Sequence, residues 1–373
     1  MTERERILTV LNGETPDRIP FMLDLSHFYY EKFGKEWNIL NGYVKPDTEL
    51  INYHKKFKAG FYIPNQSLQF SVKYGDNMKV SVETLSVNGN PEIHWKYETP
   101  YGEIERIRIW EKSSYSWAIK KWGVTTEQDL KVLGFAMASR TFEPLVKNYL
   151  AWDKYIGDIG IAYLTSGYSA MGYILNYWMG IENTVYACED WNSLMHEVTD
   201  QINDNCLKTV RLLAEYPAPA AIMGDNFSSE IQSESFFNEW SAPFYKEAIN
   251  IFHSKGKKVA VHVDGKLRGA IRMIGNCGAD IIDAVTPSPM GDLTPDECRA
   301  EAGPRLILSG GVPPNLWLPS VPVETFRQSV KDWLNLKHAS SALIAAAGDQ
   351  VPPFAEEERI NVMRELVEEY GRD

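Results

Sequence analysis

Short apolar runs alternate with amphipathic stretches along most of this chain. The segment 257–265, KKVAVHVDG, shows the pattern most clearly, because three apolar residues lead directly into His262 and Asp264. A β-branched run that turns polar as it leaves the core is typical of a buried parallel strand. His262 and Asp264 are two positions apart, so both side chains point to one side of an extended chain and can act on one ligand.

Eight such runs occur in the chain, and helical patterns separate the later ones. The predicted strands are Arg18–Leu23, Gly60–Ile63, Ile159–Leu164, Ala220–Met223, Val259–Val263, Asp280–Val285, Leu306–Leu308 and Leu343–Ala346. The predicted helices between or after them are Asn192–Ala214, Phe236–His253, Phe326–Leu336 and Glu356–Tyr370. Strands that alternate with helices form βαβ units around a parallel sheet. Eight of them predict the α/β fold of a (β/α)8 TIM barrel, here with an N-terminal helix before the first strand.

One region interrupts the alternation. Residues 78–110 alternate apolar and polar positions around Asn-Gly and Tyr-Gly turns, which predicts antiparallel hairpins. We expect residues 74–125 to form a β-hairpin insertion after the second strand, projecting over the barrel mouth. Insertions of this kind commonly form lids or docking surfaces. The whole chain, 1–373, is expected to be a single domain.

Composition argues against several kinds of partner. The chain has 38 basic and 50 acidic residues, a formal net charge of -12, so we expect neither nucleic acid nor an anionic membrane to bind it. No apolar run approaches the roughly 20 residues that span a bilayer. The charged opening MTERERILTVLNGE does not resemble a signal peptide, and a cytoplasmic location is expected. The four cysteines lack CxxC spacing, which indicates neither a disulfide framework nor a thiolate zinc site.

The active sites of such barrels lie at the carboxyl ends of the strands. The residues at these positions are Asp24, Asn65, Gln66, Ser166, Gly167, Tyr168, Asp225, Asn226, His262, Asp264, Asp283, Ser309, Gly310, Gly311, Asp349 and Gln350. Several are carboxylates, which are costly to hold there without a proton, a metal ion or a cationic substrate. We therefore predict that Asp225, His262 and Asp264 are catalytic.

These residues also have structural alternatives. Asp225 and Asp283 are placed where they can cap the helices that follow. Asp24 can orient a neighbouring loop, and His262 can be a core histidine whose hydrogen bonds are satisfied. The sequence alone leaves these alternatives open.

Three stretches of the chain resemble the uroporphyrinogen decarboxylase superfamily. They are the opening ERERILTVLNGETPDRIPFM, the central TPYGEIERI followed by TTEQDLKVL, and the closing AAAGDQVPPFAEEERINVMRELVEEYG. The central stretch resembles the corrinoid-dependent methyltransferase-like branch of that superfamily. True uroporphyrinogen decarboxylases carry an arginine-bearing loop after the first strand that holds the substrate's carboxylates. The matching segment here, 22–27, MLDLSH, has no arginine, so we do not expect a polyanionic tetrapyrrole to be the substrate.

The resemblance also implies a zinc site, in altered form. Corrinoid-linked members bind zinc through a His-x-Cys motif after the fifth strand and a Cys in the closing loop. The matching residues here are His262, Asp264 and Asp349, so both cysteines are replaced by aspartate. Imidazole and carboxylate are accepted zinc ligands, and an open fourth position would take the substrate. The alternative is that no metal binds and the aspartates act as general acid and cation stabiliser.

The function that the resemblance implies is methyl transfer. We expect the protein to move a methyl group from a small methylated substrate, a methoxylated aromatic compound, to a corrinoid protein, with acid or zinc activation of the leaving oxygen. The residues predicted to bind that substrate are Asn226, Tyr168, Tyr173, Asn176, Tyr177 and Glu230. Two alternatives stay open: a metal-independent decarboxylase or other lyase acting on a small acid, and a non-catalytic binding protein. The sequence is also compatible with a homodimer.

Overall fold

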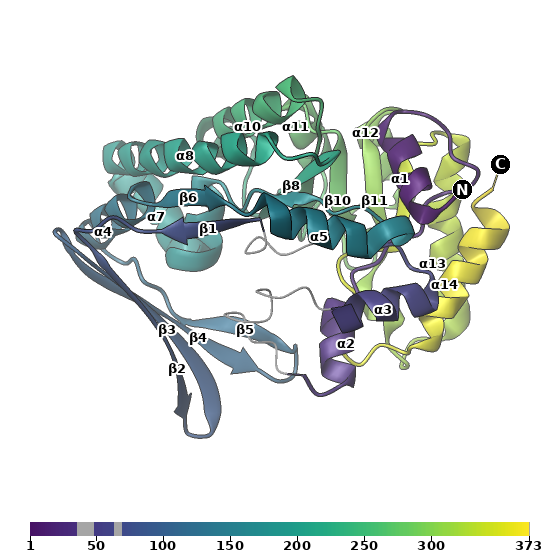
Figure 1. Cartoon of the computed structure of the whole chain (residues 1–373), viewed down its shortest axis with the longest axis horizontal. Coiled ribbons are helices and arrows are strands. Elements are labelled where there is room, and N and C mark those ends of the chain that lie inside the picture. Colours follow the sequence, from purple (N-terminus) through teal and green to yellow (C-terminus); the bar gives the residue numbers. More distant parts are fainter. Residues whose placement is uncertain (36–47, 63–68, 373) are drawn as a thin grey trace.

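The computed structural model describes residues 1–35, 48–62 and 69–372 (Figure 1). At its centre is a six-stranded parallel sheet in the order β7-β8-β9-β10-β11-β12. Its strands are β7 (Leu164–Thr165), β8 (Ala220–Phe227), β9 (Lys258–Val263), β10 (Ile281–Val285), β11 (Ile307–Val312) and β12 (Leu343–Ala347). The prediction of an α/β fold with a parallel sheet is confirmed.

Three predicted strands are shorter than the sequence suggested. Instead of full strands, the amino-terminal segments form isolated parallel bridges: Phe21 with Ala345, Met22 with Gly60, and Phe61 with Gly160. The predicted Ile159–Leu164 is thereby reduced to one bridge and the short β7, while Ile63 lies outside the described residues. Close approach of the backbones requires glycine here, because a Cβ at Gly160 would lie 1.9 Å from the Phe61 carbonyl oxygen.

Helices surround the parallel sheet, and the longest of them begin and end near their predicted limits. The α-helices are α1 (Glu3–Leu11), α2 (Ser26–Lys32), α3 (Thr48–Phe57), α4 (Glu127–Ala138), α5 (Val146–Ile156), α6 (Ala170–Tyr173), α7 (Ile181–Asp190), α8 (Asn192–Ala214), α9 (Glu234–Phe236), α10 (Ala242–Ser254), α11 (Ala270–Asn276), α12 (Pro295–Ala302), α13 (Val323–Asn335) and α14 (Glu358–Tyr370). The π-helical turns η3 (Ile174–Trp178) and η4 (Phe237–Ser241) extend α6 and α9. Within the described residues, no helix has both the length and the apolar character needed to cross a membrane.

The predicted hairpins form a four-stranded antiparallel sheet that extends away from the parallel one (Figure 1). Its strands are β2 (Lys79–Val87), β3 (Asn90–Thr99), β4 (Gly102–Glu111) and β5 (Ser116–Lys121). A third, two-stranded sheet pairs β1 (Phe70–Lys73) with β6 (Thr141–Pro144), and the sequence did not indicate it. These two short strands come directly before and after the segment that carries the four-stranded sheet and α4.

Helix α1 covers the amino-terminal ends of the parallel strands. Its apolar side shares one buried cluster with residues of the strands and bridged segments: Ile7, Val10, Leu11, Met22, Tyr62, Ile161, Tyr163, Ala220, Ile222, Ala260, Ile281, Ile307 and Ile344. Ala220, Ile281 and Ile307 are the first residues of β8, β10 and β11. The opposite, carboxyl-terminal strand ends are therefore the ones left for polar side chains.

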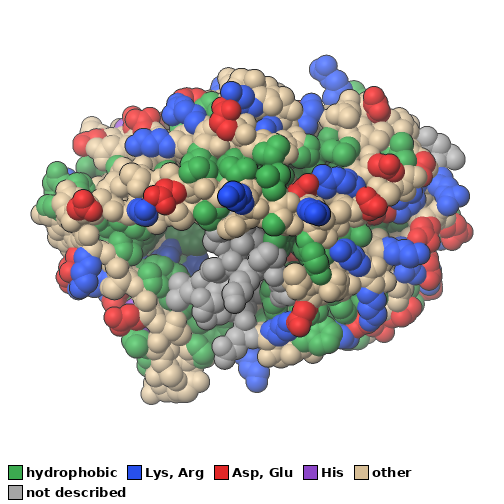
Figure 2. Space-filling model, viewed as in Figure 1, with side chains coloured by type: hydrophobic (Ala, Val, Ile, Leu, Met, Phe, Trp, Pro, Cys, Tyr) green, Lys and Arg blue, Asp and Glu red, His purple; other side chains and the backbone are tan. Residues whose placement is uncertain are grey.

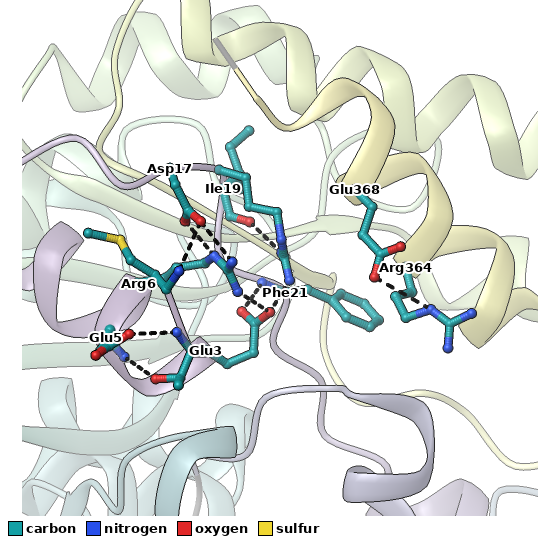
Figure 3. Close-up of polar contacts among 11 residues, drawn as sticks. Glu3, Glu5, Arg6, Asp17, Ile19, Phe21, Arg364 and Glu368 are labelled. Carbon is teal, nitrogen blue, oxygen red and sulfur yellow. Dashed lines mark hydrogen bonds and ion pairs between the residues drawn. The ribbon is translucent and has the colours of Figure 1, made fainter.

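A buried carboxylate fixes α1 to the first bridged segment (Figure 3). Glu3, 7% exposed, accepts hydrogen bonds from the guanidinium groups of Arg18 and Arg6 and, at 3.1 Å, from the backbone N–H of Phe21. Arg6 also donates to both oxygens of Asp17, at 2.6 and 2.9 Å. Glu3 thus joins the helix to the chain that enters the parallel sheet.

We expect Glu3→Ala to lower the free energy of unfolding by about 3 kcal/mol, because the substitution leaves the buried Arg18 charge without its carboxylate. Urea denaturation measured by circular dichroism tests this. Glu14→Ala, at an exposed glutamate after the same helix, is the matched control and should change stability by no more than about 0.5 kcal/mol. Equal effects of the two substitutions would contradict a structural role for Glu3.

Candidate functional site

His262 lies between two carboxylates at the carboxyl-terminal end of the parallel sheet. It is on β9, and its Cα pairs in register with that of Asp283 on β10. The His262 Nδ1 lies 3.1 Å from Oδ2 of Asp283, and its Nε2 lies 3.9 Å from Oδ1 of Asp349, which follows β12. The first distance is a hydrogen bond and the second is too long for one. The Nε2 side of the ring is therefore the side open to another group.

The surrounding charges favour the protonated ring. Burial lowers the pKa of His262, but the hydrogen bond and charge of Asp283, followed by the charges of Asp349 and Asp264, outweigh burial and raise the pKa to about 9. Burial also raises the pKa of Asp349, to about 6, with His262 opposing the rise and Asp264, Asp24 and Asp283 adding to it. At pH 7, His262 is thus charged and Asp349 is mostly ionised.

Asp283 is a site residue that the sequence prediction of catalytic groups missed. Its side chain is 1% exposed, and its Oδ2 accepts a hydrogen bond from Nδ1 of His262. The alternative of helix capping does not hold, because Thr294 caps the following helix α12. A register shift interrupts the β10–β11 pairing between Ile282 and Val285, and Ala284 there has a φ of 66°. Bulges of this kind re-aim side chains next to active sites.

Asp264 and Asp24 approach this cluster without a hydrogen bond to His262. Asp264 is exposed, and its backbone N–H donates to the Phe227 carbonyl at 2.9 Å. Asp24 accepts from the backbone N–H of Ser26 at 2.8 Å, which fits the alternative of orienting a loop. Asn65 and Gln66, predicted at the end of the second strand, lie outside the described residues.

The predicted zinc ligands do not form a three-ligand group among the described residues. Within the ranges 1–35, 48–62 and 69–372, no three or more His, Cys, Asp or Glu side chains gather as a set that could hold one. The 3.9 Å between His262 and Asp349 also exceeds the roughly 3.3 Å expected between two ligands of a tetrahedral zinc ion. The expected set of His262, Asp264 and Asp349 is thus not assembled among the described residues, although the hydrogen bond of Asp283 to Nδ1 leaves Nε2 of His262 free.

Asp225, on β8, is held by a dense set of hydrogen bonds. It is 1% exposed and accepts from the backbone N–H of Ser169 at 2.6 Å, from the Ser169 hydroxyl, and from the Tyr245 hydroxyl at 2.8 Å. Burial raises its pKa, and these hydrogen bonds oppose the rise. Ser169 caps α6, so Asp225 fastens the turn between β7 and α6 to β8 and caps no helix itself.

The segment after β7 carries most of the predicted substrate residues. Asn176 donates from Nδ2 to the backbone oxygen of Asp225 at 3.1 Å. The Tyr177 hydroxyl donates to that of Tyr168 at 2.9 Å. The Tyr168 ring centroid lies 4.9 Å from that of Tyr177 and 5.4 Å from that of Tyr173, so the three rings form one cluster.

The two remaining predicted substrate residues follow Asp225 along the chain. Asn226 has a φ of 49°, within a register shift between Met223 and Phe227 in the β8–β9 pairing. A positive φ in a residue other than glycine is a strained conformation that often marks a functional site. Glu230 is exposed, and its backbone N–H faces the Ser228 hydroxyl at 3.4 Å. No contact joins Glu230 to the His262 cluster among the described residues.

A parallel sheet flanked by helices, with ionisable side chains gathered at its carboxyl-terminal strand ends, defines an α/β protein with the layout of an enzyme active site. The uroporphyrinogen decarboxylase (URO-D) family model matches residues 160–370 of this chain, which is more than half of its length. The chain belongs to that family. Among curated proteins, no match to this sequence was found.

One of three solved structures compared with this chain shares its fold. A methyltransferase from Methanosarcina mazei superposes with a TM-score of 0.63 and 13% identity, and the alignment covers 99% of each chain. Two 3-dehydroquinate dehydratases, from Clostridium difficile and Geobacillus kaustophilus, give TM-scores of 0.28 and 0.29, identities of 15% and 14%, and cover 61% and 67% of this chain and 76% and 90% of theirs. Only the first superposition is close enough to show a shared fold.

We expect Asp283→Asn to lower the pKa of His262 by at least about one unit, because the substitution removes the charge next to Nδ1. NMR titration of the histidine ring protons measures this directly. In the wild type the raised pKa stabilises the fold fully below about pH 6.5, the unfolded value, and this contribution is lost as the pH rises through about 9. Asp283→Asn should flatten that part of the stability profile, and an unchanged His262 titration would show that Asp283 does not support the ring.

Proposed function

We propose that this protein transfers a methyl group from a methoxylated aromatic substrate to a corrinoid carried by a partner protein. The observation that carries the proposal is His262, with Asp283 on one ring nitrogen and the other nitrogen open beside Asp349. The TM-score of 0.63 to a methyltransferase supports the same class of reaction. We further propose that the bridges of Phe21, Gly60 and Phe61 close the sheet into an eight-stranded barrel, with the β2–β5 sheet over its mouth.

Cleaving a methyl ether needs an acid, because an alkoxide or phenolate oxygen is a poor leaving group. In the proposed reaction the bond between the methyl carbon and the substrate oxygen breaks, and the oxygen leaves with the bonding electrons. His262 donates the proton on Nε2 to that oxygen, so the product departs as a neutral hydroxyl compound. The corrinoid of the partner supplies the nucleophile that accepts the methyl group.

The neighbouring carboxylates have distinct parts in this scheme. Asp283 accepts from Nδ1, which fixes the ring orientation and stabilises its positive charge before transfer. Asp349 is 33% exposed, so it can return a proton from solvent to Nε2 after turnover. Asp225 is fully engaged in hydrogen bonds, and we assign it the role of holding the Tyr168 segment in place. We assign the contacts with the substrate or the partner protein to Asn226, which has a strained backbone conformation, and to the exposed Asp264.

We expect His262→Asn to reduce methyl transfer at least about a hundredfold, since it removes the general acid. The assay follows the absorbance of the methylated corrinoid when the enzyme is mixed with reduced corrinoid protein and a methoxyaromatic compound. His253→Asn is the matched control, because His253 also pairs with an aspartate, Asp280, at 2.7 Å, but outside the proposed site. Equal activity of the two variants would refute the assignment of His262.

We expect metal chelation to leave this activity unchanged, because the described residues assemble no three-ligand site. The measurement is the transfer rate before and after dialysis against EDTA, with zinc added back as a control. A loss of activity that zinc restores would mean that ligands gather during turnover.

Release of carbon dioxide from an acid substrate without any corrinoid would instead favour the alternative of a decarboxylase.

A further inference from the structure

A second set of buried charges lies in a cavity between the antiparallel sheet and the segment after β7. The cavity has a volume of about 360 Å³, within the range of small-ligand sites. Its lining includes Arg106 of β4 and Arg140, which lies between α4 and β6. Figure 2 shows the molecule hollowed beside the β2–β5 sheet. The other lining residues that matter here are aromatic: Trp95, Tyr97, Tyr168, Tyr173, Tyr177 and Trp178.

The first observation is a charge without a counter-charge. Arg106 is 7% exposed, and among the described residues it forms no ion pair. Its Nη1 donates to the Tyr177 carbonyl at 3.3 Å, while its buried Nε has no partner within the described part of the chain. Burial and the nearby charge of Arg108 lower its pKa to about 10, so it is still protonated at neutral pH. An uncompensated buried guanidinium is costly unless an anion joins it.

The second observation is that Arg140 lines the same cavity as Arg106. It is also 7% exposed, and it donates to Met137, Asn205 and Cys206 without a carboxylate partner among the residues described. Arg106, Arg140 and Tyr97 line the same cavity, and the positive charges of both arginines oppose the rise in the pKa of Tyr97. Two cations therefore face one cavity.

The third observation concerns the shape of the ligand. The Arg106 guanidinium lies 4.6 Å from the Trp95 ring centroid and 4.7 Å from that of Trp178, so it is stacked among rings. Walls of this kind accept a flat, apolar body next to an anionic group. Tyr168 lines the cavity, and the next residue, Ser169, donates to Asp225, which fixes this wall of the cavity to β8.

We propose that this cavity binds an aromatic carboxylate, with Arg106 as the principal contact for the carboxyl group and Arg140 as the second. The proposal deepens the proposed function by naming the substrate class as a methoxylated aromatic acid, and to that extent it rests on that function. A planar carboxylate can take two parallel hydrogen bonds from one guanidinium, which uses the donors that Arg106 has free. The aromatic side chains hold the ring, and the carboxyl group replaces the missing counter-charge.

Calorimetric titration of the whole protein tests the proposal without any turnover. The wild type should bind 4-methoxybenzoate at least about tenfold more tightly than its neutral analogue 4-methoxybenzyl alcohol, since a hydrogen-bonded charge pair favours the acid. Equal binding of the two compounds, or binding of neither, would overturn the proposal. This comparison needs no variant and is therefore independent of any effect on folding.

Arg106→Met should remove the preference for the acid, with affinity for 4-methoxybenzoate lowered at least about tenfold and that for the alcohol changed less than about threefold. Arg108→Met is the matched control. Arg108 is 8% exposed and lies two residues along the same strand, but it does not line the cavity. Thermal unfolding of both variants verifies that they are folded. If Arg108→Met abolishes the preference as strongly as Arg106→Met, the assignment to this cavity is wrong.

Failure of this inference and failure of the proposed function are distinguishable. If the acid binds selectively but no methyl group reaches the corrinoid, the cavity is confirmed and the methyl transfer is refuted. If transfer occurs equally well from the acid and the alcohol, the function holds and the cavity does not select a carboxylate.

Discussion

A charge that leaves water during folding must find an opposite charge or hydrogen bonds, and this constraint organises the whole molecule. At the amino-terminal end of the parallel sheet, Glu3 is matched by Arg18 and Arg6. At the carboxyl-terminal end, His262 is matched by Asp283. In the cavity beneath the antiparallel sheet, Arg106 has no match among the described residues. The pairing of Glu3 supports the fold, and the pairing of His262 with Asp283 keeps the imidazole ring protonated. The unpaired Arg106 gives the cavity a preference for an anion.

Two carboxylates of the candidate site lie at local irregularities of the strands. Asp283 and Asp225 each precede a residue with positive φ, Ala284 at 66° and Asn226 at 49°, and both lie where the ladder loses its register. A regular strand would alternate its side chains between the two faces of the sheet. The extra residue of a bulge breaks this alternation, so a carboxylate can turn toward its neighbour. The strain is offset by the packing of strands that are buried on both faces.

Much of the framework was predictable, because it follows from local periodicity. The helix Asn192–Ala214 has the predicted bounds, and β9, β10 and β12 differ from their predicted ranges by one residue at most. The lengths of the first two strands were overestimated, because isolated bridges and not continuous ladders pair these two segments with the sheet. Asp283 was identified at a strand end, yet capping was an equally good interpretation. The structure distinguishes the two, because Asp283 pairs with His262 while Thr294 caps the following helix.

The arginines were not predictable from any single stretch of sequence. Arg106 and Arg108 alternate with isoleucines on a strand that the sequence indicates only as a hairpin, and Arg140 is far from both along the chain. Arg106 and Arg140 line one cavity because β4 and the turn after α4 fold against the Tyr168 segment. Members of this family that hold polyanionic substrates were expected to carry arginine after the first strand, where this chain has Asp24. The positive charge that faces a ligand here comes from a different element, near an aromatic wall, and this suits a smaller anion with one flat ring.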